Sequence, residues 1–450
     1  AYVCPHAAIR PFLATEEQAA ASGLEWKQGL GETKALKFRI QVSPMDCTGC
    51  NNCVDVCPAK EKALVMRPLA EQVKEAKNWD YVTKNIGYTE HVDKTKSVKN
   101  LQFAQPLFEF SGACAGCGET PYAKLATQLF GDRMFIANAT GCSSIWGGSA
   151  PATPYTVNKK GFGPAWQNSL FEDNAEFGYG MALGQKAIRS RLAEYVGKIA
   201  ELAECDEVKS ACATYLETTT DSKANRVATD ALIEKLEVLA TKDGEIAELA
   251  KKTLIDKDEL AKKSVWILGG DGWAYDIGFG GLDHVMASGE NVNILVFDTE
   301  VYSNTGGQAS KATPIGSVAQ FAAGGKAMKK KDLAAIAMSY GYVYVAQVAM
   351  GADFNQCIKA MVEAESYNGP SIIICYAPCI NHGIKGGMGV AQIEEQKAVE
   401  AGYWNCFRFD PRLAEEGKNP FMLDSKAPTA SYRDFIMSEV RYNRLARANP

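Results

Sequence analysis

The sequence predicts an α/β fold: an open parallel sheet, interrupted by a helical insertion and preceded by a small, cysteine-rich α+β module. Three observations support this prediction. Short apolar runs that end in Gly, Asp or Pro recur between residues 134 and 375, as buried parallel strands do. A long block rich in Ala, Glu and Lys has apolar residues at helical spacing. Closely spaced cysteines fill a short segment near the N-terminus.

Composition restricts the possible functions before any motif is considered. The chain has 450 residues, of which 46% are hydrophobic, and this length corresponds to about three domains. Its 48 basic and 53 acidic residues give a net charge of −5, and no basic stripe indicates nucleic-acid binding. No apolar run approaches the roughly 20 residues that cross a bilayer, and the first residues lack a signal-peptide pattern. We therefore expect a cytoplasmic protein with no membrane or nucleic-acid partner.

The most specific motif is the run Cys47-x-x-Cys50-x-x-Cys53-x-x-x-Cys57-Pro. It has the spacing of a bacterial ferredoxin run, in which three cysteines hold one 4Fe-4S cluster and the fourth belongs to a second cluster. Cys4, followed by Pro, has the form of the end of an earlier copy and is expected to complete the first set. Cys57 then serves a further cluster whose other ligands are absent, which indicates a fragment. A zinc site fits less well, because zinc modules usually use two separated pairs.

The domain boundaries follow from changes in composition. Residues 1–66 form the ferredoxin-like iron-sulfur module, in which residues 36–42 alternate as a half-buried strand does. Residues 67–105 are polar without periodicity and are predicted to be an extended connector. The α/β domain is expected over residues 106–390. Residues 391–450 carry prolines between polar stretches and are predicted to form a C-terminal arm.

Within the α/β domain, four apolar runs are the expected parallel strands: residues 134–137, 265–268, 293–297 and 371–375. Ligands of open α/β sheets bind beyond the carboxyl ends of the strands, so functional loops are expected after these runs.

The block from about residue 185 to 262 departs from this pattern. Its apolar residues recur at helical spacing, as in Ile188, Leu192, Tyr195, Ile199 and Leu202, and again in Leu232, Leu236 and Leu239. We predict a helical insertion, interrupted near Gly244.

Two glycine-containing loops follow neighbouring predicted strands. Residues 269–273 read Gly-Gly-Asp-Gly-Trp, and residues 298–307 read Asp-Thr-Glu-Val-Tyr-Ser-Asn-Thr-Gly-Gly. A carboxylate between glycines can bind Mg²⁺ while the backbone approaches phosphates, and a hydroxyl and a carbonyl of the second loop can complete the shell. The two loops together resemble the thiamine diphosphate-binding signature, with Asp298 and Thr299 in place of the commoner paired asparagines. A Rossmann site is not expected, because its glycine fingerprint is missing.

A second group of cysteines opens the α/β domain. Cys114 and Cys117 lie in Ser-Gly-Ala-Cys-Ala-Gly-Cys-Gly-Glu-Thr-Pro, Cys142 follows the first predicted strand, and Cys379 follows the last. Cys114 and Cys117 alone could equally form a redox pair, half of a zinc site or part of a cluster.

Together, the ferredoxin run, the Cys114–Cys117 motif and the two glycine-containing loops resemble pyruvate:ferredoxin oxidoreductase of the single-chain type, over essentially all 450 residues as its C-terminal part. The resemblance implies that Cys114, Cys117, Cys142 and Cys379 hold the cluster nearest the cofactor. It implies Mg²⁺ binding by Asp271, Thr299 and the Val301 carbonyl. It also implies a cofactor lining, with Asn304 as the catalytic candidate: Glu119, Cys142, Gly270, Asp271, Gly272, Trp273, Thr299, Glu300, Val301, Tyr302, Ser303 and Asn304.

The implied reaction is oxidative decarboxylation of pyruvate with coenzyme A to acetyl-CoA and carbon dioxide, with electrons passed singly through 4Fe-4S clusters to ferredoxin or flavodoxin. The implied cofactors are thiamine diphosphate, magnesium and the clusters, and the implied assembly is a homodimer. The activating glutamate, the substrate arginine and the coenzyme A domain would lie in an N-terminal portion outside this chain, so the chain alone is expected to be inactive. The alternatives are a related oxidoreductase for another 2-oxoacid and a non-catalytic iron-sulfur module.

Overall fold

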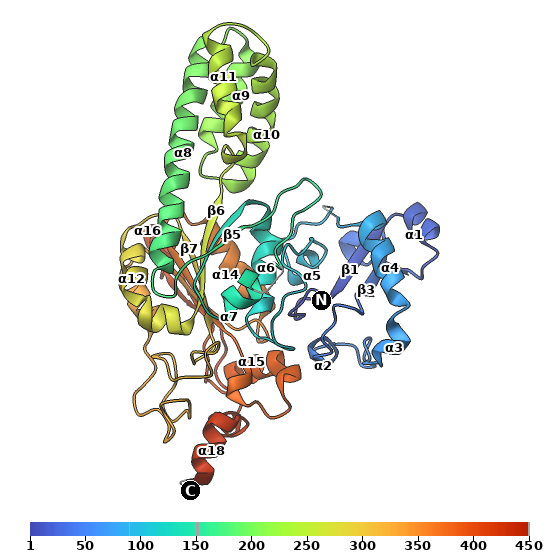
Figure 1. Cartoon of the computed structure of the whole chain (residues 1–450), viewed down its shortest axis with the longest axis vertical. Coiled ribbons are helices and arrows are strands. Elements are labelled where there is room, and N and C mark those ends of the chain that lie inside the picture. Colours follow the sequence, from blue (N-terminus) through green and yellow to red (C-terminus); the bar gives the residue numbers. More distant parts are fainter. Residues whose placement is uncertain (90, 150–152, 449–450) are drawn as a thin grey trace.

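The computed structural model describes residues 1–89, 91–149 and 153–448, and an eight-stranded sheet forms its centre (Figure 1). Its five pairings among β5, β4, β6, β7, β9 and β8 are parallel, whereas β10 and β11 continue the sheet antiparallel. The order across the sheet is β11 (Phe421–Leu423), β10 (Phe407–Phe409), β8 (Tyr344–Val348), β9 (Ser371–Tyr376), β7 (Asn293–Asp298), β6 (Ser264–Gly270), β4 (Met134–Asn138) and β5 (Ala165–Asn168). The predicted α/β class is confirmed.

The central strands are apolar on both faces because helices cover both sides. Along β6, Val265 and Ile267 enter one buried cluster and Trp266 and Leu268 enter the other, as the two-residue period of a strand requires. One face is covered by α5 (Val98–Leu101), α6 (Thr120–Phe130) and α14 (Phe354–Ser366). The other is covered by α12 (Phe279–Ala287), α13 (Leu333–Met338), α15 (Ala391–Glu400) and α17 (Tyr432–Met437).

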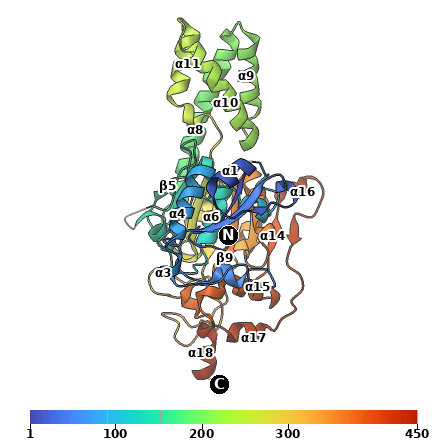
Figure 2. The ribbon, with the colours of Figure 1, turned by 90° about the vertical axis from the view of Figure 1, so that its right-hand side faces the viewer.

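A four-helix bundle projects from one end of the sheet (Figures 1 and 2). It consists of α8 (Asn174–Leu202), α9 (Asp206–Glu217), α10 (Ser222–Leu239) and α11 (Glu245–Ile255). These helices enclose an apolar core of their own, which includes Leu192, Tyr215 and Leu232. The bundle occupies the stretch predicted to be helical, but α8 begins earlier, because its first turns pack on the sheet: a Cβ at Gly178 would lie 2.5 Å from Ile267.

The N-terminal module lies beside α6 (Figure 1). It contains an antiparallel sheet of β1 (Ile9–Ala14), β3 (Lys37–Val42) and β2 (Lys27–Gln28), with α1 (Glu16–Ser22) and α2 (Asn52–Asp55). The strand expected at residues 36–42 is therefore present as β3.

The stretch predicted to be an extended connector is largely helical. It contains α3 (Leu69–Gln72), α4 (Glu75–Tyr81), the π-helical turn η2 (Val82–Ile86) and α5. Trp79, Val82 and Ile86 are buried, and Phe12 of β1 lies in the same cluster as Val82 and Ile86. Because each short helix buries so few apolar residues, no periodic pattern marks it in the sequence.

The C-terminal arm also differs from the prediction. β10 and β11 extend the main sheet, α15 packs on its face, and α16 (Pro411–Glu415) and α18 (Val440–Ala448) complete the segment. Pro411 begins α16, and Pro420 and Pro428 lie between elements, so the segment is not a free arm. Among the described residues, no helix is both long enough and apolar enough to span a membrane.

Candidate active site

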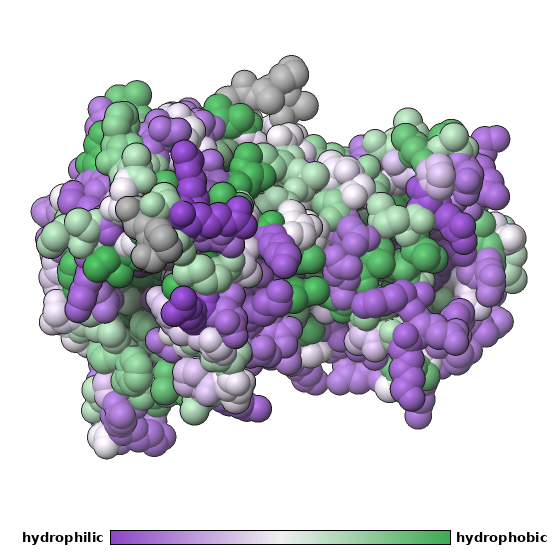
Figure 3. All heavy atoms as spheres, turned by 90° about the horizontal axis from the view of Figure 1, so that it is seen from below, coloured by the Kyte–Doolittle hydropathy of each residue, from purple (hydrophilic) through white to green (hydrophobic). Residues whose placement is uncertain are grey.

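Four adjacent parallel strands end at one edge of the sheet, and each is followed by predicted site residues. Cys142 begins α7 (Cys142–Ser144) after β4, Asp271 follows β6, Thr299 follows β7 and Cys379 follows β9. Carboxyl ends of neighbouring parallel strands are where open α/β sheets bind ligands. Figure 3 views the molecule from the side of α15 and α18, toward which these ends point.

The three oxygens predicted to bind magnesium lie together. The Thr299 hydroxyl oxygen is 2.9 Å from Asp271 Oδ1 and 3.0 Å from the carbonyl oxygen of Val301. Octahedral Mg²⁺ with ligands at 2.0–2.1 Å places adjacent ligand oxygens about 3 Å apart. The spacing of these oxygens therefore fits a magnesium ion.

Two buried carboxylates face each other at this point. Burial, and then the neighbouring Asp298, hold the pKa of Asp271 well above its usual range. The Ser310 hydroxyl donates to Asp271 Oδ2 at 2.6 Å, and the Tyr275 hydroxyl donates to Asp298 Oδ2 at 2.7 Å. Because a bound cation would stabilise the ionised Asp271, the donor set has the charge that a magnesium site requires.

Glu300 faces a buried ionic network. Its carboxylate lies 3.0 Å from Lys330 Nζ and 2.7 Å from Arg441 Nη1, and the Tyr403 hydroxyl donates to it at 2.7 Å. Although burial opposes ionisation, Lys330 and Arg441 lower the pKa of Glu300 to about 2. Glu300 also has a left-handed φ of 60°, so its side chain points into this network while its backbone continues the loop.

Glycines let the two cofactor loops approach each other. A Cβ at Gly272 would lie 2.5 Å from the Tyr302 ring, and one at Gly269 would lie 2.4 Å from the Trp273 ring. Trp273 is buried, Tyr302 and Ser303 are half-buried, and Asn304 is exposed on the loop. Gly270 has open space at its Cβ position apart from one backbone oxygen at 3.9 Å.

The second cysteine group surrounds the same edge. The pKa of Cys142 is raised by burial and by Glu119, with Cys117 and Cys379 among its charged neighbours. Burial, together with the neighbouring Glu119 and Cys114, raises the pKa of Cys379 to about 11. A Cβ at Gly118 would lie 2.5 Å from the Pro378 carbonyl, and the Gly118 N–H donates to that carbonyl at 3.2 Å. This close approach brings the Cys114–Cys117 loop to Cys379.

One contact joins the second cysteine group to the cofactor loop. Cys142 Sγ lies 3.2 Å from the Ser303 hydroxyl oxygen. Nearby, Glu119 is buried and accepts a hydrogen bond from Trp146 Nε1 at 2.8 Å; burial raises its pKa to about 7. A cluster held by Cys142 would therefore lie beside a cofactor held by the loop.

The N-terminal cysteines form a separate group. Burial, together with the nearby thiols of Cys4, Cys50 and Cys47, raises the pKa of Cys53 to about 11. Cys57 belongs to the same run and is half-buried, and the Ala63 N–H donates to its sulfur at 3.4 Å. The assignment of Cys57 to another cluster stays a prediction.

The two cysteine groups meet at one backbone segment. The backbone of Gly116, which lies between Cys114 and Cys117, helps to lower the pKa of Cys50 against the effect of burial. A Cβ at Gly116 would lie 2.4 Å from the Met388 carbonyl, and one at Gly389 would lie 2.7 Å from the Cys50 carbonyl. The two groups are therefore neighbours across a thin layer of backbone.

None of these cysteine groups is arranged for a single metal ion. Over the described residues, no three Cys, His, Asp or Glu side chains gather as ligands of one ion. A zinc ion holds sulfur at about 2.3 Å, which requires much closer thiols than a cluster whose several iron atoms each take one cysteine.

Two segments match known protein families. Residues 1–61 match "4Fe-4S dicluster domain", and residues 249–375 match "Thiamine pyrophosphate enzyme, C-terminal TPP binding domain". The first contains Cys4 and the ferredoxin run, and the second contains both cofactor loops. The predicted cofactor classes are thereby confirmed at the level of the two domains.

Curated relatives align with the whole chain. "Pyruvate:ferredoxin oxidoreductase" of Moorella thermoacetica is 59% identical over 460 residues, and "Pyruvate-flavodoxin oxidoreductase" of Klebsiella pneumoniae is 56% identical over 452 residues. The chain is homologous to pyruvate:ferredoxin oxidoreductases. Each alignment covers 100% of this chain and 38% of the relative, so the chain spans little more than a third of their length.

More distant oxidoreductases extend the comparison. The mitochondrial "Pyruvate dehydrogenase [NADP(+)]" of Euglena gracilis is 51% identical over 452 residues, covering 100% of this chain and 25% of the relative. A solved 2-oxoglutarate:ferredoxin oxidoreductase from Magnetococcus marinus matches 76% of this chain and 92% of its own chain with 14% identity and a TM-score of 0.35, a likeness too weak to define the fold.

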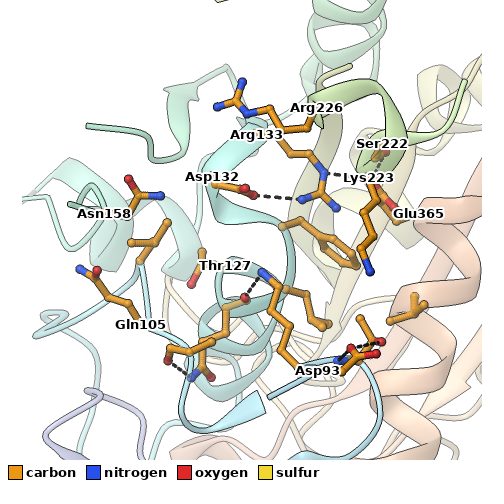
Figure 4. Close-up of a pocket in the computed structure, with 18 of the residues that line it drawn as sticks. Asp93, Gln105, Thr127, Asp132, Arg133, Asn158, Ser222, Lys223, Arg226 and Glu365 are labelled. Atoms are coloured by element: carbon orange, nitrogen blue, oxygen red, sulfur yellow. Dashed lines mark hydrogen bonds and ion pairs between the residues drawn. The ribbon is translucent and has the colours of Figure 1, made fainter. Parts of the chain in front are cut away.

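A large cavity lies away from the cofactor loops of this oxidoreductase homologue (Figure 4). It has a volume of about 1180 Å³ and lies between the connector, the sheet and the bundle. Three of its charged side chains pair with one another: Arg133 lies 3.0 Å from Asp132 and 3.4 Å from Glu365, and the Ser222 hydroxyl donates to Glu365 at 2.8 Å. None of the predicted site residues lines this cavity.

Several residues that hold the two cofactor loops in place were missed by sequence reasoning. Ser310 bonds Asp271, Lys330 lies 2.7 Å from Asp298, and His382 Nε2 lies 2.7 Å from the Thr299 carbonyl. Burial lowers the pKa of His382 to about 3, so the neutral ring donates from Nε2 to that carbonyl. No local motif contains these three residues, because each reaches the loops from a different segment.

Proposed function

We propose that this chain forms the thiamine diphosphate-binding part and part of the iron-sulfur relay of a pyruvate:ferredoxin or pyruvate:flavodoxin oxidoreductase. In the overall reaction, pyruvate and coenzyme A give acetyl-CoA and carbon dioxide, and two electrons leave one at a time for a ferredoxin or flavodoxin. When bound, thiamine diphosphate supplies the electron sink for decarboxylation of the 2-oxoacid. The observation that carries the proposal is the 3.2 Å contact between Cys142 and Ser303, because it joins a predicted cluster ligand to a predicted cofactor loop.

Each group of residues has a defined part in this proposal. Asp271, Thr299 and the Val301 carbonyl hold magnesium; the Ser310 hydroxyl keeps the Asp271 carboxylate in place, and the His382 ring holds the backbone of Thr299 through its carbonyl. The remaining parts of the lining are Glu119, Gly270, Gly272, Trp273, Tyr302, Ser303 and Asn304, and the exposed Asn304 is the catalytic candidate. Glu300 contributes its backbone, because its carboxylate is paired with Lys330 and Arg441.

The cysteines form the relay. Cys114, Cys117, Cys142 and Cys379 hold the cluster beside the cofactor, and Cys4, Cys47, Cys50 and Cys53 hold the next. Cys57 serves a third cluster near the exposed surface, from which electrons leave. 4Fe-4S clusters suit this task because protein surroundings set their potentials over a wide range. We further propose that the enzyme is a cytoplasmic homodimer.

The magnesium assignment has a direct test. In the full-length protein, Asp271→Asn should weaken Mg²⁺-dependent binding of thiamine diphosphate at least about 10-fold, since even changes behind a metal ligand cost 10- to 100-fold. Isothermal titration calorimetry measures this affinity. Asp276→Asn is the matched control, because Asp276 lies in the same loop but pairs with Lys311 at 3.1 Å. Unchanged affinity in Asp271→Asn would contradict the assignment.

Substrate choice is tested separately. The anaerobic full-length enzyme should reduce ferredoxin with pyruvate and coenzyme A faster than with 2-oxoglutarate or branched-chain oxoacids. A preference for one of these other oxoacids would replace pyruvate but retain the cofactor assignment. A folded protein from which no thiamine diphosphate can be extracted would contradict both the substrate assignment and the cofactor assignment.

A further inference from the structure

One buried lysine lies between the two cysteine groups. Lys124 is on α6, only 2% exposed, and its ammonium donates to the carbonyls of Ala1, Tyr2 and Cys4 at 2.7, 2.7 and 3.1 Å. Helix α6 begins at Thr120, directly after the loop of Cys117, and lies against the N-terminal module (Figures 1 and 2). Lys124 therefore joins the helix that follows one cysteine group to the backbone of the other.

The charge of Lys124 has no carboxylate partner. Among the ion pairs between described residues, none involves Lys124, whereas the nearby buried Arg10 pairs with Glu109. All three ammonium protons go to backbone carbonyls, which are neutral acceptors. One of the three acceptors is the carbonyl of Cys4, so the ammonium of Lys124 lies beside this proposed cluster ligand.

We propose that Lys124 is a positioning residue of the electron path, whose buried positive charge raises the reduction potential of the cluster held by Cys4, Cys47, Cys50 and Cys53. This inference rests on the proposed function, since it requires that cluster. A buried cation favours the state of the cluster that carries one more electron, and low effective dielectric strengthens the interaction. The Ala8 N–H donates to Cys4 Sγ at 3.3 Å and acts in the same direction.

A relay cluster next to a strong reductant benefits from such a charge. A higher potential at the second cluster makes electron transfer away from the first cluster more favourable. Because Lys124 extends from α6, the same side chain also holds the Cys4 segment against the α/β domain. A neutral residue at position 124 could preserve the packing of the Cys4 segment against α6, but only a cation could raise the reduction potential of the cluster.

The test compares variants of the anaerobic full-length protein by EPR-monitored redox titration. Loss of one signal in Cys50→Ser identifies the cluster in question. Lys124→Gln, which keeps hydrogen-bond donors without charge, should shift the midpoint potential of that cluster to a more negative value. Lys124→Arg, which keeps the charge, should restore it. Lys94→Gln is the matched control, because Lys94 also donates to a carbonyl of α6, that of Gln128, at 2.9 Å.

The outcomes separate this inference from the proposed function. A wild-type protein without 4Fe-4S signals overturns the proposed function and this inference with it. Intact clusters with the same potential in Lys124→Gln and wild type overturn the inference alone. Should Lys124→Gln lose the cluster, Lys124→Met replaces it; if neither neutral variant holds the cluster while Lys124→Arg does, the role is assembly and potential tuning is rejected.

Discussion

At the residue scale, Gly272 shows how closely the cofactor loops pack. We expect Gly272→Ala to destabilise the fold by about 1–3 kcal/mol, because its Cβ would overlap the Tyr302 ring. The displaced loop should also bind thiamine diphosphate less tightly. Gly280→Ala is the matched control, since no atom lies within 4 Å of its Cβ position in α12, and it should stabilise by up to about 1 kcal/mol. Urea unfolding measures the stability of both variants. A Gly272→Ala protein that unfolds at the same urea concentration as wild type would contradict the packing argument.

Glu395 gives a prediction about pH. Its carboxyl is fully buried on α15, and burial raises its pKa to about 8 from an ordinary value of 4.5. The Tyr122 hydroxyl lies 2.9 Å from the Tyr376 carbonyl and 3.0 Å from Glu395 Oε2. Since the tyrosine has one proton, a protonated Glu395 can donate to the Tyr122 oxygen while Tyr122 donates to the carbonyl.

The sign of the pH effect follows from linkage. Between about pH 4.5 and 8 the unfolded carboxyl releases its proton while the folded one retains it, so the free energy of unfolding falls as pH rises. The decrease should amount to a few kcal/mol, since each pKa unit corresponds to about 1.4 kcal/mol. In Glu395→Gln, whose side chain stays neutral, the free energy of unfolding should fall less between about pH 4.5 and 8. Glu400 is exposed on the same helix, and Glu400→Gln should leave this pH dependence unchanged. Denaturant titrations at several pH values measure the free energy of unfolding. If it falls equally with pH in Glu395→Gln and wild type, Glu395 is not the source of the pH dependence.

Some residues of the site were predictable from sequence, and the reason is spacing. Asp271, Thr299 and the ferredoxin cysteines lie in short motifs, because one loop must supply several ligands at once. Ser310 and Lys330 have no such signal, because each contributes one contact from a separate segment. Glu300 was predicted to line the cofactor, yet its carboxylate faces the ionic network, and only three-dimensional contacts show that direction.

At the element scale, the ionic network connects α18 to the cofactor loop. Arg441 lies 2.7 Å from both Glu300 and Glu439. We expect Arg441→Met to destabilise the protein by about 3–5 kcal/mol, because it leaves buried carboxylates without their partner. Arg444→Met, on an exposed position of the same helix, should have little effect, and Arg441→Lys should lie between the two. Chemical denaturation provides the comparison, and equal stability of the Arg441 and Arg444 variants would show that the network carries no net stabilisation.

The elements divide into predictable and unpredictable ones. The four strands expected from apolar runs are present as β4, β6, β7 and β9, because strands buried on both faces are apolar throughout. The edge strands β5 and β11, and β10 beside β11, were missed, since only three or four residues with mixed burial form each of them. β8 was missed too, although all but one of its residues are buried, because no apolar run was recognised there.

At the scale of the whole molecule, the cofactor edge is only partly covered. Ile315, Phe321 and Met328, in the loop segment between β7 and α13, are 56%, 95% and 73% exposed. The chain also spans 38% of the length of its first two relatives. We therefore expect the isolated 450 residues to bind thiamine diphosphate and iron-sulfur clusters without oxidising pyruvate. Anaerobic assays with coenzyme A and ferredoxin test this, and turnover equal to that of the full-length enzyme would refute it.

The network around Glu300 has a consequence for biosynthesis. Asp271 and Arg441 are separated by a stretch that a ribosome translates in about 10–30 s at typical rates of 5–20 residues per second. During that interval the nascent chain already has the first magnesium ligand but lacks the guanidinium that holds the Glu300 turn. We therefore expect the loop that carries Glu300 to reach its folded geometry only after α18 has been synthesised.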